Sequence, residues 1–392
     1  MKQLISILGS TGSIGTTTLK IVDKKKHQLK PYIFSANKNF NLICGQIKKY
    51  KPKIFVVTDY RTFEKVKIKF KKKNIKILNN FNDLKSLKKN NITISAIPGI
   101  AGLKPTIKMI KMSKKILLAN KESIICGWNI IKKNSKIYNT KLIPIDSEHY
   151  SIAKLLEKHN INEIKKIYIT ASGGPFLNYT INQLKKVKPI DALKHPKWNM
   201  GKKISIDSST LMNKLLELIE AQKFFNIPNN ILEIIIHPNS LVHAIISLKN
   251  GISLFLYHET SMIIPIANAI FDGKININEL YKIKNKKKHL DISSLVFEKV
   301  NPKTFPLIKL KEQVNKYPSS PIIVNASNEI LVDQFIHKKI PFLGIFKIIM
   351  MIFKDNNYKK YAIKKPKNIN QITKIDTWAK LKTMENIKKI YD

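Results

Sequence analysis

Short apolar runs alternate with amphipathic stretches through the first 145 residues of the chain. The apolar runs read LISILG, PYIFSA, KIFVVTD, ITISAIPG, KILLAN and KLIPID. The stretches between them, such as TGSIGTTTLKIVDKK and LKPTIKMIKMSK, carry apolar residues at helical spacing. This alternation predicts a parallel α/β sheet with right-handed crossovers.

The pattern changes after residue 145. Residues 146–275 mix strand-like runs (KKIYITAS, LEIIIHP, HAIISLKNGISLFLYH) with helical stretches such as SSTLMNKLLELIEAQKFF, which predicts an α+β domain. Residues 276–309 have few periodic signals and are predicted to be a connector, and residues 310–392 are mostly helical in pattern. We therefore expect an α/β protein with a Rossmann-like domain at 1–145, a central domain at 146–275 and a C-terminal helical domain at 310–392.

The segment ILGSTGSIG places Gly9, Gly12 and Gly15 after the first strand and at the start of a helix. Glycine permits a tight turn and lets the backbone approach a pyrophosphate at the helix N-terminus. Thr11 and Ser13 would add hydroxyl donors, and Ile14 would pack beneath the helix. The alternative is a tight βα turn that binds no ligand.

The end of the second strand distinguishes the two nicotinamide cofactors. A fold that prefers NAD usually has an acid there to bind the ribose 2′-hydroxyl. This chain has Asn37, Lys38 and Asn39 instead, and a lysine flanked by amides suits a 2′-phosphate. The sequence thus favours NADP over NAD, with a ligand-free polar loop as the alternative.

Two carboxylates, Asp146 and Glu148, follow the apolar run KLIPI. If the chain is extended through residue 148, both side chains lie on one face at the ligand-binding edge of the sheet. Two adjacent carboxylates need a positive group nearby, either lysines or a hard cation such as Mg²⁺ or Mn²⁺. The spacing alone leaves the metal site and the salt-bridged pair open. His149 could also bind a metal, but alternation turns it away, which favours a role in supporting the ligands or in packing.

A further candidate site lies in DSSTLMNKLLELIE. Asp207 or Ser208 would cap a helix on which Asn213 and Lys214 share a face with Glu217. Such a helix resembles a phosphate cradle, but the spacing alone favours a capped amphipathic helix with an exposed polar face.

The loop that follows the strand KKIYITAS carries further candidates. In ASGGPF, Ser172 and the two glycines after it form either an anion-binding nest or a tight turn. Farther along, Trp198 lies in a polar loop, where it either packs a small core or covers a substrate. The nearby His195 is a candidate phosphate contact or acid–base group.

The net charge is unusual, because 71 Lys+Arg against 26 Asp+Glu give +45. Such a charge is typical of nucleic-acid or membrane-surface binding. However, Arg61 is the single arginine, and the lysines are spread along the whole length with many Ile and Asn residues, which indicates drift toward AT-rich codons. We expect no nucleic-acid partner, although the charge would attract phosphorylated substrates.

The sequence also suggests where the protein works. The apolar patch IFKIIMMIFK is too short to cross a bilayer, and the N-terminus has no signal-peptide pattern. Cys44 and Cys126 are isolated, so we expect buried thiols rather than disulfides or a zinc site. We therefore expect a cytoplasmic protein without a membrane partner.

Several motifs occur together in a specific order: GSTGSIG, LLANKES, IDSEH, SGGPF, HPKWNMGKKISIDSST, MNK followed by Glu217, HPNSLVH and VNASNEI. Over nearly its whole length the chain resembles the 1-deoxy-D-xylulose 5-phosphate reductoisomerase family. The resemblance implies rearrangement of the sugar phosphate and reduction by NADPH to 2-C-methyl-D-erythritol 4-phosphate, with Mg²⁺ or Mn²⁺ bound. It also implies a homodimer and a lid at residues 172–202 in the catalytic domain.

The resemblance implies a role for individual residues, motif by motif. The implied metal ligands are Asp146, Glu148 and Glu217, which with Lys121 and His195 form the catalytic set. The implied substrate contacts are Lys121, Ser147, Glu148, Ser172, His195, Trp198, Ser208, Asn213, Lys214 and Glu217. The implied cofactor contacts are Thr11, Gly12, Ser13, Ile14, Asn37, Lys38, Asn39, Asn120, Glu122 and Gly201. His237 lies in a matching motif without a defined role.

Some positions depart from the family pattern. Leu215 stands where the family usually has glycine, and the segment from His258 to Ile263 lacks the family's Pro-Asp pair and arginine. Two other functions remain open: another NADP oxidoreductase, such as a semialdehyde or homoserine dehydrogenase, and a basic nucleic-acid-binding protein. The first leaves DSEH unexplained, and the second requires lysines clustered on one surface.

Overall fold

The computed structural model describes residues 1–84, 88–198, 200–280 and 295–392. The chain forms two compact units that interleave along the sequence. Unit 1 comprises Met1–Ser123, Asn129–Tyr150 and Ser261–Leu290, and unit 2 comprises Ile124–Trp128, Ser151–Thr260 and Asp291–Asp392. The four predicted domains stay a prediction; much of the expected connector, and residue 199 of the expected lid, lie outside the described residues.

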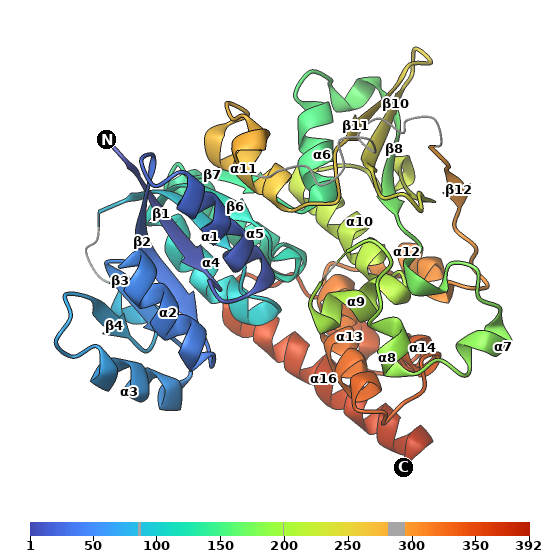
Figure 1. The fold of residues 1–392 in the computed structure, drawn as a ribbon. Helices are drawn as coiled ribbons and strands as arrows, with labels where there is room; N and C mark the ends of the chain where they lie inside the picture. The colour runs from blue at the N-terminus through green and yellow to red at the C-terminus, as the bar shows by residue number, and fades with distance from the viewer. Residues whose placement is uncertain (85–87, 199, 281–294) are drawn as a thin grey trace. The chain divides into compact units, whose positions relative to one another are not determined.

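Unit 1 is built on a seven-stranded sheet in which every strand pair is parallel (Figure 1). The strand order is β4-β3-β2-β1-β5-β6-β7. The strands are β1 (Gln3–Leu8), β2 (Leu29–Ala36), β3 (Ile54–Val57), β4 (Lys76–Leu78), β5 (Asn90–Ser95), β6 (Ser113–Leu118) and β7 (Lys141–Pro144). The predicted α/β class is confirmed. Strand β4 was not predicted, because it is three residues long and adjoins a lysine-rich run.

The helices of unit 1 connect successive strands. They are α1 (Ser13–Lys24), α2 (Phe40–Tyr50), α3 (Tyr60–Lys69), α4 (Leu103–Ile110) and α5 (Lys121–Ile137). From β1 the chain adds strands in one direction as far as β4, then returns to the other side of β1 with β5. The carboxyl ends of β1 and β5 therefore flank the switch point, where doubly wound sheets bind dinucleotides.

A late segment completes the core of unit 1. Helix α11 (Ile263–Phe271) contributes five buried residues to the apolar cluster that includes strands β1, β2 and β5: Ile263, Ile266, Ala267, Ala269 and Ile270. Lys115 of β6 donates through Nζ to the carbonyl oxygens of Ala269 (2.9 Å) and Ile270 (2.8 Å). The N-terminal sheet thus packs against a helix from a segment more than 100 residues later in the chain.

Unit 2 contains a five-stranded mixed sheet in the order β11-β10-β8-β9-β12. The strands are β8 (Ile164–Ala171), β9 (Leu232–Ile236), β10 (Val242–Leu248), β11 (Ser253–Tyr257) and β12 (Glu298–Lys299). Buried residues of α6 (Ser147–Leu156) and α10 (Met212–Phe225) pack against this sheet, among them Ile152 and Leu218. The predicted α+β arrangement of the central region is confirmed.

The remaining helices of unit 2 are α7 (Ile181–Leu184), α8 (Pro189–Ala192), α9 (Lys202–Ser209), α12 (Lys311–Asn315), α13 (Ser320–Ile336), α14 (Gly344–Phe353), α15 (Tyr358–Ala362) and α16 (Ile369–Tyr391). The C-terminal region is helical, as predicted. Within the described residues, none of the helices is long and apolar enough to cross a membrane. Both cysteines are buried free thiols, as expected.

Candidate active site

The glycine turn of unit 1 is tightly packed. Gly9 has φ +80°, and a Cβ there would lie 2.6 Å from the carbonyl oxygen of Ala96. A Cβ on Gly15 would lie 2.3 Å from the carbonyl oxygen of Gly9. The Ser10 hydroxyl donates a buried hydrogen bond of 2.6 Å to Gln46 Oε1, which holds the turn in place. The two glycines are therefore required to bring the turn, helix α1 and the loop after β5 together.

The N-terminus of α1 is suited to bind an anion. Its N-cap residue is Gly12, which offers no side-chain acceptor for the first N–H groups of the helix. These donors, with the helix dipole, attract a phosphate group. Gly12 and Ser13 are exposed, Thr11 and Ile14 are half-buried, and Asn37 and Lys38 are exposed after β2. Asn39 caps α2 by accepting a hydrogen bond from the Leu42 amide (3.1 Å), so its side chain already has a structural role.

Asn120 connects the end of β6 to the loop after β5. Its side chain donates to the carbonyl oxygens of Ile97 and Gly99 and accepts from the amide of Ser123, which caps helix α5. Lys121 and Glu122 follow in the first turn and are both buried. The Lys121 ammonium lies 2.8 Å from Asp146 Oδ2. The motif ANKES therefore links the predicted cofactor edge of the sheet to the carboxylate segment within unit 1.

The chain is not extended from Asp146 through Glu148, so the condition for β alternation is not met. Strand β7 ends at Pro144, and α6 begins at Ser147, so Glu148 lies in the first turn of a helix. The Tyr150 amide donates to the Asp146 carbonyl oxygen (2.8 Å), and the Ser147 hydroxyl donates to Glu148 Oε2 (2.6 Å). The two carboxylates are thus close through a strand-to-helix turn rather than through β alternation. His149 is fully buried.

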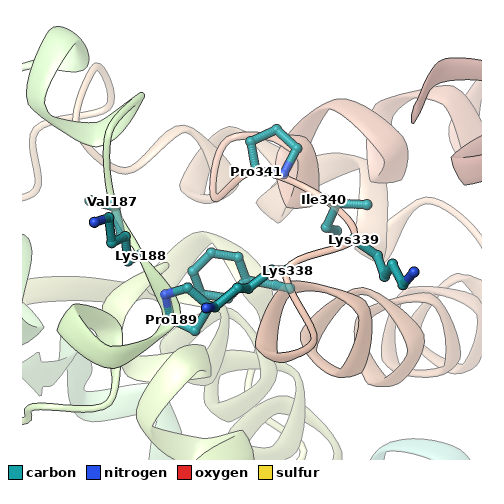
Figure 2. Close-up of a pocket in the computed structure, with 8 residues that line it drawn as sticks. Val187, Lys188, Pro189, Lys338, Lys339, Ile340 and Pro341 are labelled. Atoms are coloured by element: carbon teal, nitrogen blue, oxygen red, sulfur yellow. The ribbon is translucent and has the colours of Figure 1, made fainter. Parts of the chain in front are cut away.

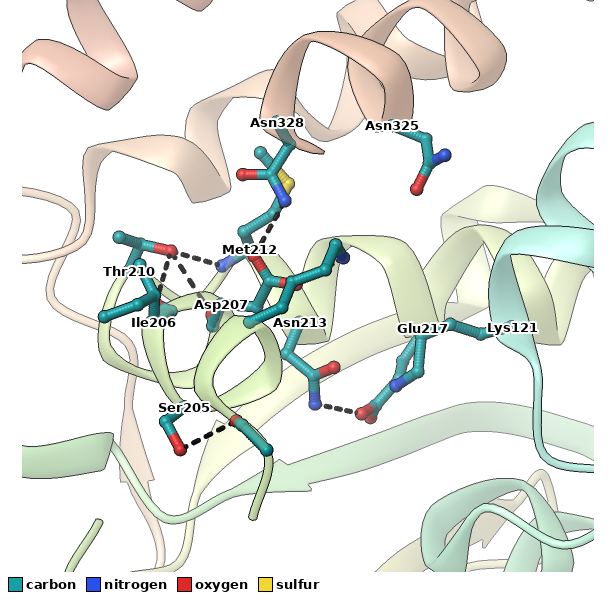
Figure 3. Close-up of polar contacts among 12 residues, drawn as sticks. Lys121, Ser205, Ile206, Asp207, Thr210, Met212, Asn213, Glu217, Asn325 and Asn328 are labelled. Atoms are coloured by element: carbon teal, nitrogen blue, oxygen red, sulfur yellow. Dashed lines mark hydrogen bonds and ion pairs between the residues drawn. The ribbon is translucent and has the colours of Figure 1, made fainter. Parts of the chain in front are cut away.

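In unit 2, the polar face of α10 is buried rather than exposed. Glu217 is 1% exposed, while Asn213 is 9% and Lys214 is 8% exposed. The Asn213 amide donates to Glu217 Oε1 (Figure 3). Lys214 Nζ lies 2.8 Å from Glu217 Oε2. The interpretation of an exposed amphipathic face is therefore wrong. A carboxylate this deeply buried requires charge compensation, which Lys214 supplies here.

The predicted cap of this helix is also wrong. Asp207 and Ser208 belong to the preceding helix α9, and α10 begins at Met212 after Leu211, which has φ 60° and ψ 9°. The segment expected to be one helix is thus two helices joined by a left-handed leucine. Non-glycine residues rarely adopt this conformation, because the Cβ crowds the backbone.

The two glycines of ASGGPF bring the loop after β8 against α9. Gly173 and Gly174 both have positive φ, and a Cβ on Gly174 would lie 3.0 Å from the Ser208 carbonyl oxygen. The Gly174 amide donates to the Ser172 hydroxyl oxygen (3.1 Å). Ser172 and Ser208 are both half-buried. The loop forms a tight turn that packs on the Ser208 backbone, and its binding of an anion stays a prediction.

His195 contacts Ser172 in the loop after β8. Its Nδ1 accepts from the backbone amides of Lys197 (3.1 Å) and Trp198 (2.9 Å). Because Nδ1 is an acceptor, the neutral ring carries its proton on Nε2, which lies 3.0 Å from the Ser172 hydroxyl. Burial, with a smaller contribution from the Lys214 charge, lowers the pKa of His195 to about 4.

We predict that His195 stays neutral from pH 5 to pH 8. In the unfolded chain an ordinary imidazole binds a proton below about pH 6.5, whereas the folded protein resists protonation down to about pH 4. The group therefore makes the free energy of unfolding fall as the pH drops from about 6.5 toward 4. Urea unfolding of the wild type and His195→Gln between pH 7 and pH 5 checks this. An equal loss of stability in both proteins would contradict it.

Trp198 packs against a pair of histidines. Its ring lies edge-on to that of His243 at 6.2 Å between centroids, and His243 stacks on His258 at 3.8 Å. His258, one of the departures from the family pattern, therefore supports the ring that Trp198 contacts. Leu215, the other departure, is fully buried.

His237 and a pocket of unit 2 lie outside these contacts. His237 Nδ1 lies 2.8 Å from the Val296 carbonyl oxygen, and burial lowers the pKa of this ring. A pocket of about 430 Å³ is lined by residues 187–189, Phe335 and residues 338–341 of unit 2 (Figure 2). It contains lysines but no carboxylate and no predicted site residue, so it is not a candidate for metal binding.

Sequence reasoning missed one set of contacts in unit 2. Asp207 is 2% exposed and accepts from Asn328 Nδ2 of α13 at 2.7 Å (Figure 3). It also accepts from Lys203 Nζ at 2.8 Å. A signal was present, because Asn325 and Asn328 interrupt an otherwise apolar helical pattern. The pattern did not identify their partners.

Comparison with known proteins identifies the family. Three family models match: 1-deoxy-D-xylulose 5-phosphate reductoisomerase at residues 5–127, its C-terminal domain at 142–225, and the DXP reductoisomerase C-terminal domain at 258–382. A 1-deoxy-D-xylulose 5-phosphate reductoisomerase from Pelagibacter ubique (strain HTCC1062) is 43% identical over 96% of this chain and 98% of its own length. The chain belongs to the 1-deoxy-D-xylulose 5-phosphate reductoisomerase family.

Other reductoisomerases give the same result. The enzyme from Wolbachia sp. subsp. Drosophila simulans (strain wRi) is 39% identical over 88% of both chains. The crystal structure of a reductoisomerase with NADPH, fosmidomycin and magnesium matches with a TM-score of 0.89 and 29% identity over 100% of both chains. The Zymomonas mobilis reductoisomerase with NADPH matches over the same coverage with a TM-score of 0.87. Membership in this family excludes the dehydrogenase and nucleic-acid-binding alternatives as the family of this chain.

Proposed function

We propose that this reductoisomerase rearranges 1-deoxy-D-xylulose 5-phosphate and reduces the product with NADPH to 2-C-methyl-D-erythritol 4-phosphate, a step of non-mevalonate isoprenoid synthesis. The observation that carries the proposal is family membership over nearly the whole chain. The protein is accordingly an NADPH-dependent oxidoreductase that requires Mg²⁺ or Mn²⁺.

We assign metal binding to Asp146, Glu148 and Glu217. The side chains fit a hard divalent ion, because all three supply carboxylate oxygens. Asp146 and Glu217 each have a lysine ammonium within 2.8 Å, so both environments already accommodate a positive charge beside the carboxylate. When bound, the ion supplies stabilisation for negative charge on the substrate oxygens.

NADPH fits the edge of the unit 1 sheet. The backbone packs too closely at Gly9 and Gly15 to admit a Cβ, which fixes the turn before α1, and the α1 N-terminus offers amide donors without a side-chain cap. The proposed contacts are Thr11, Gly12, Ser13, Ile14, Asn37, Lys38, Asn39, Asn120, Glu122 and Gly201. Among these, the exposed Lys38 would bind the 2′-phosphate.

The remaining residues hold the sugar phosphate. Ser172, Ser208, Asn213 and Lys214 would donate to the phosphate oxygens, with the neutral His195 keeping the Ser172 hydroxyl in place. Lys121 and Ser147 would contact the substrate hydroxyls. Trp198 would cover the substrate and exclude water from the reacting atoms.

A single assay tests the proposed reaction. Purified protein is incubated with 1-deoxy-D-xylulose 5-phosphate, NADPH and Mg²⁺ or Mn²⁺ while cofactor absorbance is followed. We expect oxidation of NADPH that a chelator stops and added metal restores. Oxidation unaffected by the chelator, or none with either metal, would refute the assignment.

We also propose a cytoplasmic homodimer. The family resemblance supports this state, and so does the edge strand β11, near which the apolar side chains of Ile252 (54%) and Phe255 (48%) are exposed. Edge strands with exposed apolar residues favour pairing with another chain. Sedimentation equilibrium would distinguish the dimer from a monomer.

A further inference from the structure

Helix α13 carries two buried amides on one face. Asn325 is 1% and Asn328 is 0% exposed, and the residues around them on this helix are also buried. Burying an amide is unfavourable unless it forms hydrogen bonds. Asn328 Nδ2 donates to Asp207 Oδ1 at 2.7 Å (Figure 3). Asn325 Nδ2, by contrast, lies 3.8 Å from Cys126 Sγ. Asn328 is thus bonded to α9, and Asn325 is not.

Asp207 receives two donors from different elements. Lys203, one turn earlier on α9, binds Oδ2, while Asn328 binds Oδ1 across 121 residues of sequence. The bond to Lys203 stays within one helix and cannot orient that helix. The bond to Asn328 connects α9 to a separate, fully packed helix, so it restrains the rotation and position of α9.

The connection matters because α9 and α10 meet at an unfavourable backbone conformation. Leu211 is left-handed, and Thr210 Oγ1 accepts from the Met212 amide (3.3 Å) at the same joint. Ser208 precedes this joint, and Asn213 and Lys214 follow it. A strained joint persists only when its surroundings determine it. Relaxation at Leu211 would separate the hydroxyl on α9 from the ammonium on α10.

We propose that Asn328 is a positioning residue for phosphate binding, which acts through Asp207 to hold the α9–α10 joint. The inference rests on the proposed function, because that function assigns Ser208, Asn213 and Lys214 to the substrate phosphate. Asn328 touches neither substrate nor cofactor in this role. It keeps the donors of two helices directed at one phosphate group.

The first experiment compares Asn328→Leu with Asn325→Leu in the full-length enzyme. Leucine keeps the branching and the number of heavy atoms of the asparagine side chain but has no polar group, and both positions are buried on the same helix, so the larger methyl groups affect both variants. For Asn328→Leu we expect KM for the sugar phosphate to rise about tenfold, equivalent to about 1.4 kcal/mol. We expect the dissociation constant for NADPH to change less than twofold, and the KM of Asn325→Leu to stay near the wild-type value. Equal KM values in all three proteins would overturn the proposal, even if Asn328→Leu melts at a lower temperature.

A reciprocal exchange tests the same bond without removing its polar groups. Asn328→Asp places two carboxylates together and should raise KM further. Adding Asp207→Asn restores one donor and one acceptor, so the double variant should recover most of the lost affinity. A double variant no better than Asn328→Asp would overturn the proposal.

A readout independent of turnover separates this inference from the proposed reaction. Inorganic phosphate should raise the melting temperature of the wild type more than that of Lys214→Met. The rise in Asn328→Leu should also be smaller than the rise in the wild type. If the wild type shows no turnover but the phosphate effect follows this order, the reaction assignment fails and the positioning role stands. If phosphate stabilises wild type and Asn328→Leu equally above Lys214→Met, the positioning role fails.

Discussion

Glu217→Gln should lower turnover about 1,000-fold or more, about 4 kcal/mol of transition-state stabilisation, while leaving NADPH affinity within twofold of the wild type. Glutamine preserves the shape of the side chain and one of the two acceptor oxygens that face Asn213 and Lys214, but it removes the charge that binds a divalent ion. Steady-state kinetics over a range of Mn²⁺ concentrations, with NADPH binding by fluorescence titration, measures both quantities.

A matched variant separates this effect from general loss of charge. Glu233→Gln removes a carboxylate from strand β9, where Glu233 pairs with Lys166 and is partly exposed. We expect its turnover to equal that of the wild type. If Glu217→Gln weakens NADPH binding as much as it weakens turnover, the assignment of Glu217 to the metal is incorrect.

Gly15→Ala should weaken NADPH binding about 100-fold, about 2.7 kcal/mol. The added methyl would lie 2.3 Å from the Gly9 carbonyl oxygen and 2.6 Å from the Ser10 Cα, so the turn must move away from α1. That movement displaces the amide donors at the helix N-terminus, where we place the pyrophosphate. Isothermal titration with NADPH measures the change.

Gly45→Ala is the appropriate control for this variant. Gly45 lies inside helix α2 in the same unit, and a Cβ there meets nothing within 4 Å. Replacing a helical glycine with alanine should increase stability by about 0.5–1 kcal/mol without affecting NADPH affinity. Unchanged NADPH affinity in Gly15→Ala would show that the glycine turn does not bind the cofactor.

The strands of the N-terminal sheet could be predicted because each one is marked by its own short stretch of sequence. Strands of a parallel sheet are covered on both faces, so they appear in sequence as continuous apolar runs. Strand β4 lies at the edge of the sheet and has three residues, which is too short for such a run. Its neighbouring lysines made the segment resemble a solvated surface.

The polar groups of the candidate site could be predicted only in part. The spacing of Asn213, Lys214 and Glu217 correctly placed them on one face of a helix, but it predicted that this face was exposed. Burial depends on residues that cover the face from elsewhere in the chain, and helical periodicity carries no information about them. The left-handed Leu211 and the bond from Asn328 to Asp207 could not be predicted for the same reason. Both depend on tertiary contacts that override local preference.

The placement of α11 has a consequence for synthesis of the chain on the ribosome. The apolar core around β1, β2 and β5 includes residues 263–270, so unit 1 cannot complete its packing until the stretch through Phe271 has been translated. In the interval, the nascent sheet exposes an apolar surface while residues 151–260 are still being made. Slow parallel sheets with uncovered apolar faces are prone to aggregation. Because α11 is encoded so late, the nascent N-terminal sheet is prone to aggregate during this interval unless chaperones bind its exposed apolar surface.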